Sequence, residues 1–231
     1  MQAVILAAGE GSRLAPLTEE TPKAMVPVEG RPIVWRVIDT LIGAGVINIV
    51  VITSGYPLGI EKYSWSGINY KEVIQPEPLG TANALMQLGS IPGSFLLLGC
   101  DALFPVEHIQ ALMRAEADIA LSGRGGAEVH HSTITYYHGG KIAGIAEKPF
   151  FPTSTTQSLM LYKLPSAIFD YLPQVKRSKR KEYEIQDAIN GMIDDGASVE
   201  VVECIGDYFH LTETDDLKKF KREDEYNIQK Q

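Results

Sequence analysis

Residues 6–23 read LAAGEGSRLAPLTEETPK and begin at the end of one short apolar strand. The strand predicted over residues 3–8 leaves a buried sheet at Gly9, where open α/β sheets keep their ligands. Gly9 and Gly11 let backbone N–H groups approach phosphate oxygens closely, because glycine has no side chain in the way. The stretch therefore predicts a phosphate-binding turn at the carboxyl edge of an α/β sheet.

Two cations follow this turn and differ in chemistry. The planar guanidinium of Arg13 suits a pyrophosphate group that must leave, while the compact ammonium of Lys23 suits a phosphorus centre that gains charge in a transition state. Together these parts can hold a nucleoside triphosphate for attack at its α-phosphorus. The Walker spacing is absent, and the dinucleotide fingerprint would need a third glycine where Leu14 stands. The alternative interpretation is a turn whose glycines serve geometry only.

Strands and helices alternate after the turn. Residues 32–43 have apolar side chains at helical spacing, and residues 47–53 are almost continuously apolar and β-branched, as in a parallel strand buried on both faces. The same patterns predict further strands over residues 70–74 and 94–99 and further helices over residues 81–88 and 106–115. This alternation predicts a doubly wound parallel sheet.

The pattern changes after Asp118, where strands dominate. Strands are predicted over residues 119–122, 133–137, 141–146, 158–164 and 199–202, with a hairpin turn at residues 138–141. Helices are predicted over residues 166–171, 183–193 and 212–222. The second half therefore extends the first sheet. We predict a Rossmann-like three-layer αβα sandwich with a central mixed, mostly parallel sheet, in one domain of 231 residues.

The composition is that of an ordinary globular protein. Of the residues, 45% are hydrophobic and 22% charged, which excludes disordered and fibrous classes. A net charge of -8 argues against binding nucleic acid or lying on an anionic membrane. The two cysteines lack metal-ligand spacing, and the first apolar run is too short for a signal peptide or a membrane span. These features predict a cytoplasmic protein, and they leave open whether it forms a homo-oligomer.

A long pattern joins these features: LAAGxG[ST]RLxPLTxxxPKxxxPVxGxP runs unbroken as far as Pro32. It resembles the signature of the sugar-1-phosphate nucleotidylyltransferases, which join a nucleoside triphosphate and a phosphorylated sugar into a nucleotide sugar plus pyrophosphate. The chain has no hexapeptide array of the kind that forms a left-handed β-helix in longer members, so no acyltransfer is expected. The resemblance implies that the first half, residues 1–118, binds the nucleotide, with contacts from Leu6, Ala8, Gly9, Gly11 and Ser12.

A second motif comprises Gln75 and the run Gly80-Thr81-Ala82. A glutamine amide offers the donor and acceptor needed to read the imide edge of uracil or thymine, and Gly80 would let the base or ribose pack onto backbone. In the resembled family the corresponding glutamine and glycine contact the base. We therefore predict UTP or dTTP as the nucleotide, bound by Gln75, Gly80 and Thr81. The alternative is a strand-to-helix turn in which Thr81 caps the helix.

Asp101 follows the apolar strand at residues 94–99 and should reach the same edge of the sheet as the glycine turn. Mg²⁺ prefers hard oxygen ligands, typically one or two carboxylates together with phosphate oxygens. Asp101 is therefore the predicted magnesium ligand. The alternative is that it caps the helix near Pro105. Family members usually have Gly-Asp here, whereas Cys100 intervenes in this chain.

The second half, residues 119–231, is expected to bind the phosphorylated acceptor. Its Glu147-Lys148-Pro149 resembles a family motif that places a carboxylate on a sugar hydroxyl and an ammonium near the sugar phosphate. Ser158 stands where the family has an asparagine that binds the acceptor, and Met160 where it has a glycine. Met160 should fill space that a hexose ring would otherwise occupy. Residues 131–133 also depart from the family pattern.

The sharpest departure is His210, which aligns with the aspartate that completes the family metal site. Imidazole suits zinc, copper or nickel better than magnesium. The alternatives are that His210 is structural, that Asp207 supplies the missing oxygen, or that Mg²⁺ rests on Asp101 and triphosphate alone. On a strand, the side chain of Asp207 would point to the other face from His210.

These observations predict an enzyme that condenses UTP or dTTP with a sugar 1-phosphate and releases pyrophosphate, with Arg13, Lys23 and Asp101 as catalytic residues and Mg²⁺ as cofactor. Two alternatives remain. One is a cytidylyltransferase for a non-sugar alcohol phosphate such as a polyol or choline phosphate. The other is a regulatory homologue that binds nucleotides without turnover, which the altered acceptor half would favour.

Overall fold

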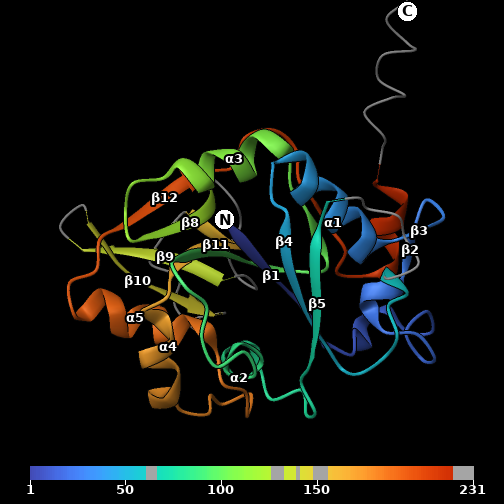
Figure 1. Cartoon of the computed structure of the whole chain (residues 1–231), viewed down its shortest axis with the longest axis horizontal. Helices are drawn as coiled ribbons and strands as arrows, with labels where there is room; N and C mark the ends of the chain where they lie inside the picture. The colour runs from blue at the N-terminus through green and yellow to red at the C-terminus, as the bar shows by residue number, and fades with distance from the viewer. Residues whose placement is uncertain (61–66, 126–132, 139–140, 148–155, 221–231) are drawn as a thin grey trace, which may run out of the picture.

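The computed structural model describes residues 1–60, 67–125, 133–138, 141–147 and 156–220. A sheet of nine strands runs through the middle of the molecule, with helices on both faces (Figure 1). Its strand order is β10-β9-β11-β6-β1-β4-β5, and β8 and β12 continue the sheet beside β11. The predicted three-layer αβα sandwich with a mixed sheet is confirmed.

The parallel part of the sheet is built around β1 (Gln2–Ala7). This strand lies between β4 (Asn48–Thr53) and β6 (Ser94–Gly99), and β5 (Asn69–Ile74) pairs with β4 in the same direction. The register sets Leu6 opposite Gly99. The chain after β1 and the chain after β6 therefore leave the sheet side by side, as the sequence predicts for the glycine turn and Asp101.

The second half joins the same sheet through β11 (Thr156–Pro165), which runs antiparallel to β6. Strands β8 (Ile119–Gly125) and β9 (Thr133–His138) pair antiparallel with β11, and β10 (Lys141–Glu147) with β9. Strand β12 (Val199–Glu203) is parallel to β8. The tip of the predicted hairpin between β9 and β10, residues 139–140, lies outside the described residues.

Helices cover the two faces of the sheet with separate cores. Helices α1 (Ile33–Gly43) and α3 (Val106–Arg114) pack on one face. Helices α2 (Thr81–Met86), α4 (Ile168–Tyr171) and α5 (Ile185–Asp194) pack on the other. All five were expected from apolar side chains at helical spacing, with ends that differ by one to two residues at most sites.

Several short elements lie outside the main sheet and the five α-helices. They are the 3-10 helices η1 (Ser12–Leu14), η2 (Lys23–Met25) and η4 (Leu172–Gln174), and the two-residue strands β2 (Pro27–Val28), β3 (Arg31–Pro32), β7 (Ala102–Leu103) and β13 (Phe209–His210). A third, small core encloses Leu14, Val28 and Leu211 among others, and it joins the segment after the glycine turn to the segment around residue 211.

The helix predicted over residues 212–222 is wrong. Within the described residues this segment forms only the 3-10 helix η5 (Thr214–Lys218). Its first turn is fixed by a capping box between Glu213 and Asp216, and Leu217 and Phe220 pack against the small core. Two apolar residues three positions apart fit a 3-10 turn as well as an α-helix. Residues 221–222 lie outside the described chain.

Across the described ranges, no helix combines the length and the apolar character that crossing a membrane requires.

Candidate active site

A cavity of about 430 Å³ opens at the carboxyl ends of β1 and β6. Ten residues singled out from the sequence line it: Leu6, Ala8, Gly9, Gly11, Ser12, Lys23, Gln75, Gly80, Thr81 and Asp101. Segments far apart in sequence meet here because the parallel strands that precede them are neighbours in the sheet. The volume is that of an ordinary small-molecule site.

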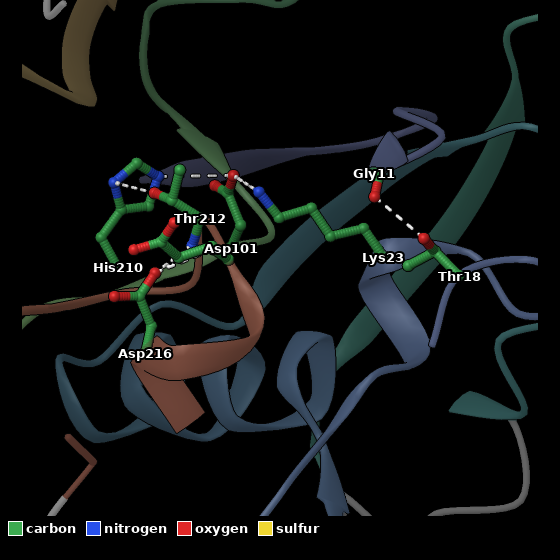
Figure 2. A network of polar contacts seen from close by, with 8 residues as sticks. Gly11, Thr18, Lys23, Asp101, His210, Thr212 and Asp216 are labelled. Atoms are coloured by element: carbon green, nitrogen blue, oxygen red, sulfur yellow. Dashed lines mark hydrogen bonds and ion pairs between the residues drawn. The ribbon is translucent and has the colours of Figure 1, made fainter. Parts of the chain in front are cut away.

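The glycine turn is shaped around Lys23. The Thr18 hydroxyl donates to the Gly11 carbonyl oxygen at 2.9 Å and closes the loop between them (Figure 2). A Cβ atom at position 11 would lie 2.8 Å from the Cβ of Lys23. Gly11 is therefore required for the close approach of Lys23. A Cβ at Gly9, in contrast, would meet nothing within 4 Å, which leaves that backbone open to a ligand.

Lys23 and Asp101 form an ion pair in the cavity, with 2.5 Å between the Nζ and Oδ2 atoms. Both side chains are mostly buried, with exposed fractions of 11% and 23%. Two neighbours set the position of Asp101: the Cys100 N–H donates to the Leu6 carbonyl oxygen at 3.0 Å, and a Cβ at Gly99 would lie 2.5 Å from Asp101 Oδ1. The absence of a side chain at Gly99 thus lets the carboxylate fold back over the strand end.

His210 reaches the same carboxylate from the far end of the chain. Strand β13 pairs with β7, and the Leu211 N–H donates to the Asp101 carbonyl oxygen at 2.8 Å. His210 Nε2 lies 3.5 Å from Asp101 Oδ2, while its Nδ1 faces the Thr212 hydroxyl at 3.4 Å (Figure 2). Asp101 therefore stands between Lys23 and His210. Asp207 is exposed and does not line the cavity.

The charges around Asp101 favour its ionised form. Burial alone would raise the pKa of Asp101, but the contact with His210 and the charge of Lys23 outweigh it, so the pKa of this carboxyl lies well below its ordinary value. The adjacent thiol behaves oppositely. Burial and the Asp101 charge raise the pKa of Cys100 to about 12, so Cys100 stays protonated and is an inert lining residue.

The donor set fits a divalent cation that keeps other ligands. Asp101 offers a carboxylate and His210 an imidazole 3.5 Å from it. Among the residues that the structure describes, no cluster of three or more His, Cys, Asp and Glu side chains could hold a metal ion by itself. Any metal bound here would therefore complete its shell with oxygens from substrate phosphates or water, as Mg²⁺ commonly does.

The predicted base-reading end of the cavity has protein contacts of its own. The Gln75 amide nitrogen donates to the Gly80 carbonyl oxygen at 3.1 Å and to Asn83 Oδ1 at 2.9 Å. A Cβ at Gly80 would lie 2.6 Å from the carbonyl oxygen of Tyr183, and the Gly80 φ angle is +104°. The space expected for a base or ribose against the α-carbon of Gly80 is thus taken by the backbone at Tyr183.

Both capping alternatives from the sequence are wrong. Gly80 occupies the N-cap of α2, and no side chain caps that helix. The Thr81 hydroxyl instead accepts a hydrogen bond at 2.9 Å from the Ile185 N–H, the first residue of α5. Likewise, Pro105 is the N-cap of α3, with no side-chain cap, so Asp101 does not serve that helix.

Two further predicted site residues, Arg13 and Ser158, do not line this cavity. Arg13 is exposed on η1 and lies outside the lining. Ser158 is only 4% exposed, and its hydroxyl bonds with the Tyr162 hydroxyl at 3.3 Å. The β11–β8 register shifts between these two residues. The role of Ser158 as an acceptor ligand stays a prediction. The side chain of Glu147, all of Lys148 and residues 131–132 lie outside the described part of the chain.

Three lining or supporting residues were not found from the sequence. Glu10 and Glu182 line the cavity, and Thr18 closes the glycine turn. Glu10 lies between the two motif glycines, so its position was a usable signal. Glu182 belongs to a charged run that carries no periodic pattern. Met160, expected to narrow the acceptor space, does line the cavity.

Known proteins with similar sequences share one enzyme family. A family model described as nucleotidyl transferase matches residues 2–207. The chain is 34% identical over 217 residues to the UTP–glucose-1-phosphate uridylyltransferase AglF of Haloferax volcanii, with 89% of each chain covered. It is 32% identical over 199 residues to the bifunctional protein GlmU of Methanococcus maripaludis, with 85% of this chain and 48% of that protein covered. The chain thus spans about half the length of its bifunctional relatives.

A solved structure from Bacillus anthracis that carries the name glucose-1-phosphate thymidylyltransferase has a TM-score of 0.80 to this chain. It is 23% identical in sequence, and the match covers 95% of this chain and 93% of the other. At that identity the similarity establishes the fold.

Proposed function

Because the chain belongs to the nucleotidyl transferase family, we propose that it joins UTP or dTTP to a sugar 1-phosphate, forming a nucleotide sugar and releasing pyrophosphate. One observation carries the proposal: Lys23 and Asp101 meet at 2.5 Å in a cavity lined by the glycine turn. An ammonium beside an open run of backbone suits the α-phosphate of a triphosphate. The name of the relative AglF supports UTP and a glucose 1-phosphate as the substrate class.

The proposed reaction is an in-line displacement at phosphorus. An oxygen of the acceptor phosphate forms a bond with the α-phosphorus, and the bond to the bridging oxygen of the β-phosphate breaks, so pyrophosphate carries away the electron pair. The Lys23 ammonium stabilises the charge that develops on the α-phosphate oxygens. No covalent intermediate with the protein is needed. Catalysis then rests on positioning and charge neutralisation.

A divalent cation is common to this family, and we propose Mg²⁺ as the ion and Asp101 as its protein ligand. The cation supplies charge neutralisation at the phosphates. Lys23 Nζ lies 2.5 Å from Oδ2 of this carboxylate. When a triphosphate offers its own oxygens to the Lys23 ammonium, Asp101 becomes available to a cation. His210 would take part as a second donor or orient Asp101 from the side.

The acceptor half supports a narrower proposal. Met160 lines the cavity beside Gly99, with its Cγ 3.8 Å from the position of a Cβ on that glycine. We infer that Met160 limits the size of the acceptor. We keep Arg13 as the residue that helps pyrophosphate depart, on the strength of its place two residues after the glycine turn. Cys100 and Cys204 are free thiols, which supports a reducing compartment such as the cytoplasm.

Pyrophosphate release tests the proposal directly. UTP, dTTP and CTP would each be incubated with Mg²⁺ and glucose 1-phosphate, N-acetylglucosamine 1-phosphate, glycerol 3-phosphate or choline phosphate, with the Lys23→Ala variant as control. We expect release with UTP or dTTP and a sugar phosphate, and none from the variant. Release with CTP and an alcohol phosphate would favour the cytidylyltransferase instead. Nucleotide-dependent stabilisation without release from any pair would overturn the catalytic proposal.

A further inference from the structure

A run of cations lies next to Glu182 at the border of the cavity. Residues 176–182 read KRSKRKE and contain five cations and one carboxylate, in a chain whose net charge is -8. We call residues 176–182 the basic hairpin. In Figure 1 it belongs to the orange segment between α4 and α5 that passes beside α2. So strong a local excess of positive charge on an acidic protein calls for a functional explanation.

The basic hairpin has a fixed backbone. The Ser178 N–H donates to the Glu182 carbonyl oxygen, and the Lys181 N–H donates to the Ser178 carbonyl oxygen, both at 2.8 Å. The Ser178 hydroxyl also accepts from the Arg180 N–H at 3.2 Å. Lys181 has a φ angle of +65°, which is uncommon for a residue with a side chain. The turn therefore holds its cations in one place.

Backbone hydrogen bonds join Tyr183, the residue after the basic hairpin, to the segment around Gly80 that lines the cavity. The Tyr183 N–H donates to the Leu79 carbonyl oxygen at 2.7 Å, and the Tyr183 carbonyl oxygen accepts from the Ala82 N–H at 2.9 Å. Glu182 itself lines the cavity. Lys179 is three residues from Glu182, so their α-carbons are at most about 10 Å apart. This separation of the two α-carbons is close to the Debye length, which is about 8–10 Å at 0.10–0.15 M ionic strength.

The cavity itself is acidic. Its described lining contains three carboxylates, Glu10, Asp101 and Glu182, and a single cation, Lys23. Lys23 pairs with Asp101 and Arg180 pairs with Glu182, so the net charge that remains is the negative charge of Glu10. A nucleoside triphosphate that approaches this mouth meets unfavourable charge from the cavity and from the protein as a whole. An external cluster of cations would reverse the local potential and raise the rate of encounter.

Two of the five cations have structural partners. The Arg177 guanidinium lies over the Tyr183 ring, 5.5 Å from its centre, and Arg180 pairs with Glu182 at 3.0 Å. The side chains of the three lysines, Lys176, Lys179 and Lys181, are exposed. The arginines thus fix the hairpin, and the lysines present charge to solvent at the side of the cavity that Gln75 and Gly80 line.

We propose that the basic hairpin captures the nucleoside triphosphate electrostatically and steers it into the acidic cavity. This inference rests on the proposed function, because it assumes that the triphosphate is the ligand of the cavity. The hairpin acts on the rate of association and makes no contact with the reacting atoms. Its effect should therefore depend on ionic strength and leave turnover of the bound complex unchanged.

The test compares two variants with the same change in net charge. In the hairpin variant, Lys176→Gln and Lys179→Gln are combined with Lys181→Gly, which removes a charge and also suits the positive φ angle. In the control variant, Lys71→Gln, Arg114→Gln and Lys141→Gln remove three exposed cations that do not line the cavity. Stopped-flow fluorescence with N-methylanthraniloyl-UTP, or its dTTP counterpart, gives association and dissociation rates without any need for turnover.

We expect the hairpin variant to associate at least about threefold more slowly than the control variant at low salt, with the difference lost near 0.5 M salt. Dissociation rates and kcat should stay the same. Equal effects in the two variants would overturn the proposal, as would a change confined to dissociation or to the KM of the acceptor. Failure of the unaltered protein to bind either nucleotide would instead overturn the proposed function, and the steering proposal with it.

Discussion

The two halves of the molecule contrast in how their candidate residues meet. In the first half, the predicted nucleotide residues from Leu6 to Asp101 converge on one cavity, Arg13 being the exception. In the second half, Ser158 is buried away from that cavity, while His210 arrives beside Asp101 through a strand pair of only two residues. The first set depends on where parallel strands end. The second depends on register and on distant contacts, which short motifs do not encode.

The two sets of predicted site residues are therefore specified differently by the sequence. Residues that follow neighbouring parallel strands meet at the same edge of the sheet, because the carboxyl ends of these strands lie together. An acceptor site in a mixed sheet needs each strand to hold the correct register, and one irregularity turns a side chain elsewhere.

Removing the ammonium at Lys23 should affect activity most. Lys23→Ala is expected to lower kcat by about 100- to 1,000-fold, because one preorganised group that stabilises transition-state charge is lost. Steady-state pyrophosphate release measures the effect. Lys71→Ala, which removes an exposed lysine from β5, is the matched control and should leave kcat unchanged. A loss below about tenfold for Lys23→Ala would show that the first half does not hold the catalytic centre.

A side chain at Gly80, where the two halves of the chain meet, should lower the stability of the protein. Gly80→Ala places a Cβ 2.6 Å from the Tyr183 carbonyl oxygen in a backbone with φ +104°, so we expect the free energy of unfolding to fall by about 2–4 kcal/mol. Gly89→Ala separates strain from contact, because Gly89 has φ +73° and open space around it. Urea unfolding of both variants measures the difference. Equal losses would mean that the approach of Tyr183 is not what requires glycine.

The acceptor half is probed by Met160→Ala. Enlarging the cavity there should change the ratio of kcat/KM between a hexose 1-phosphate and glycerol 3-phosphate by about tenfold, in favour of the larger acceptor. Ser158→Ala should leave this ratio unchanged, because the Ser158 hydroxyl bonds with Tyr162 and not with the cavity. Met86→Ala controls for lost core packing, since Met86 packs in the same core without lining the cavity. The reverse pattern would identify Ser158 as the acceptor residue.

The link between the halves at His210 should have a moderate effect. His210→Asp supplies a second hard oxygen beside Asp101, so we expect a several-fold rise in apparent Mg²⁺ affinity and in Mg²⁺-dependent turnover. Titration of activity with Mg²⁺ measures both quantities. Asp207→Asn, at an exposed position outside the cavity, is the control. Unchanged or lower activity in His210→Asp would argue that His210 serves structure only.

The contact of His108 with the second half of the chain should make stability depend slightly on pH. His108 is fully buried, with Nε2 2.6 Å from the Ser122 hydroxyl and Nδ1 accepting from the Ile205 N–H at 3.4 Å. Burial lowers the pKa of His108 below its ordinary 6.5, although the charge of Glu203 opposes this. Below about pH 6.5 the unfolded chain therefore takes up a proton that the folded chain refuses, and stability falls as the pH falls.

Urea unfolding between pH 7 and pH 5 measures this effect. The His108→Gln variant should lose that part of the pH dependence, at about 1.4 kcal/mol for each unit of displaced pKa. His138→Gln, at an exposed position on β9, should keep it. Parallel pH profiles for the unaltered protein and His108→Gln would contradict the buried neutral histidine.

Most of the fold could be predicted because its elements carry periodic apolar patterns. The run at residues 48–53 and the helical spacing at residues 33–43 are each long enough to specify an element. Strands β7 and β13 were missed because two residues carry no period. The segment after His210 was mistaken for an α-helix because its two apolar residues fit either helix type.

The candidate site was predictable only as far as motifs are contiguous. Gly9, Gly11 and Lys23 lie in one stretch, and the structure keeps them together. Gly80 was correctly placed at the cavity but for an incomplete reason, since its glycine is required by the backbone at Tyr183. Thr81 was predicted to bind the nucleotide, with capping of its own helix as the alternative, and its hydrogen bond with Ile185, 104 positions away, was not anticipated. Contacts of that separation arise from the whole fold and leave no local signal.

The hydrogen bond from Leu211 to the carbonyl oxygen of Asp101 has a consequence for biosynthesis. Chains fold from the amino end as they are made, so the glycine turn and β6 can form early. The brace on Asp101 and the imidazole of His210 cannot arrive until residue 211 has been synthesised. A nascent chain can thus carry the predicted nucleotide residues of the first half well before the Asp101 carboxylate is held in place. Full activity is then expected only after residue 211 has been synthesised and has paired with Asp101.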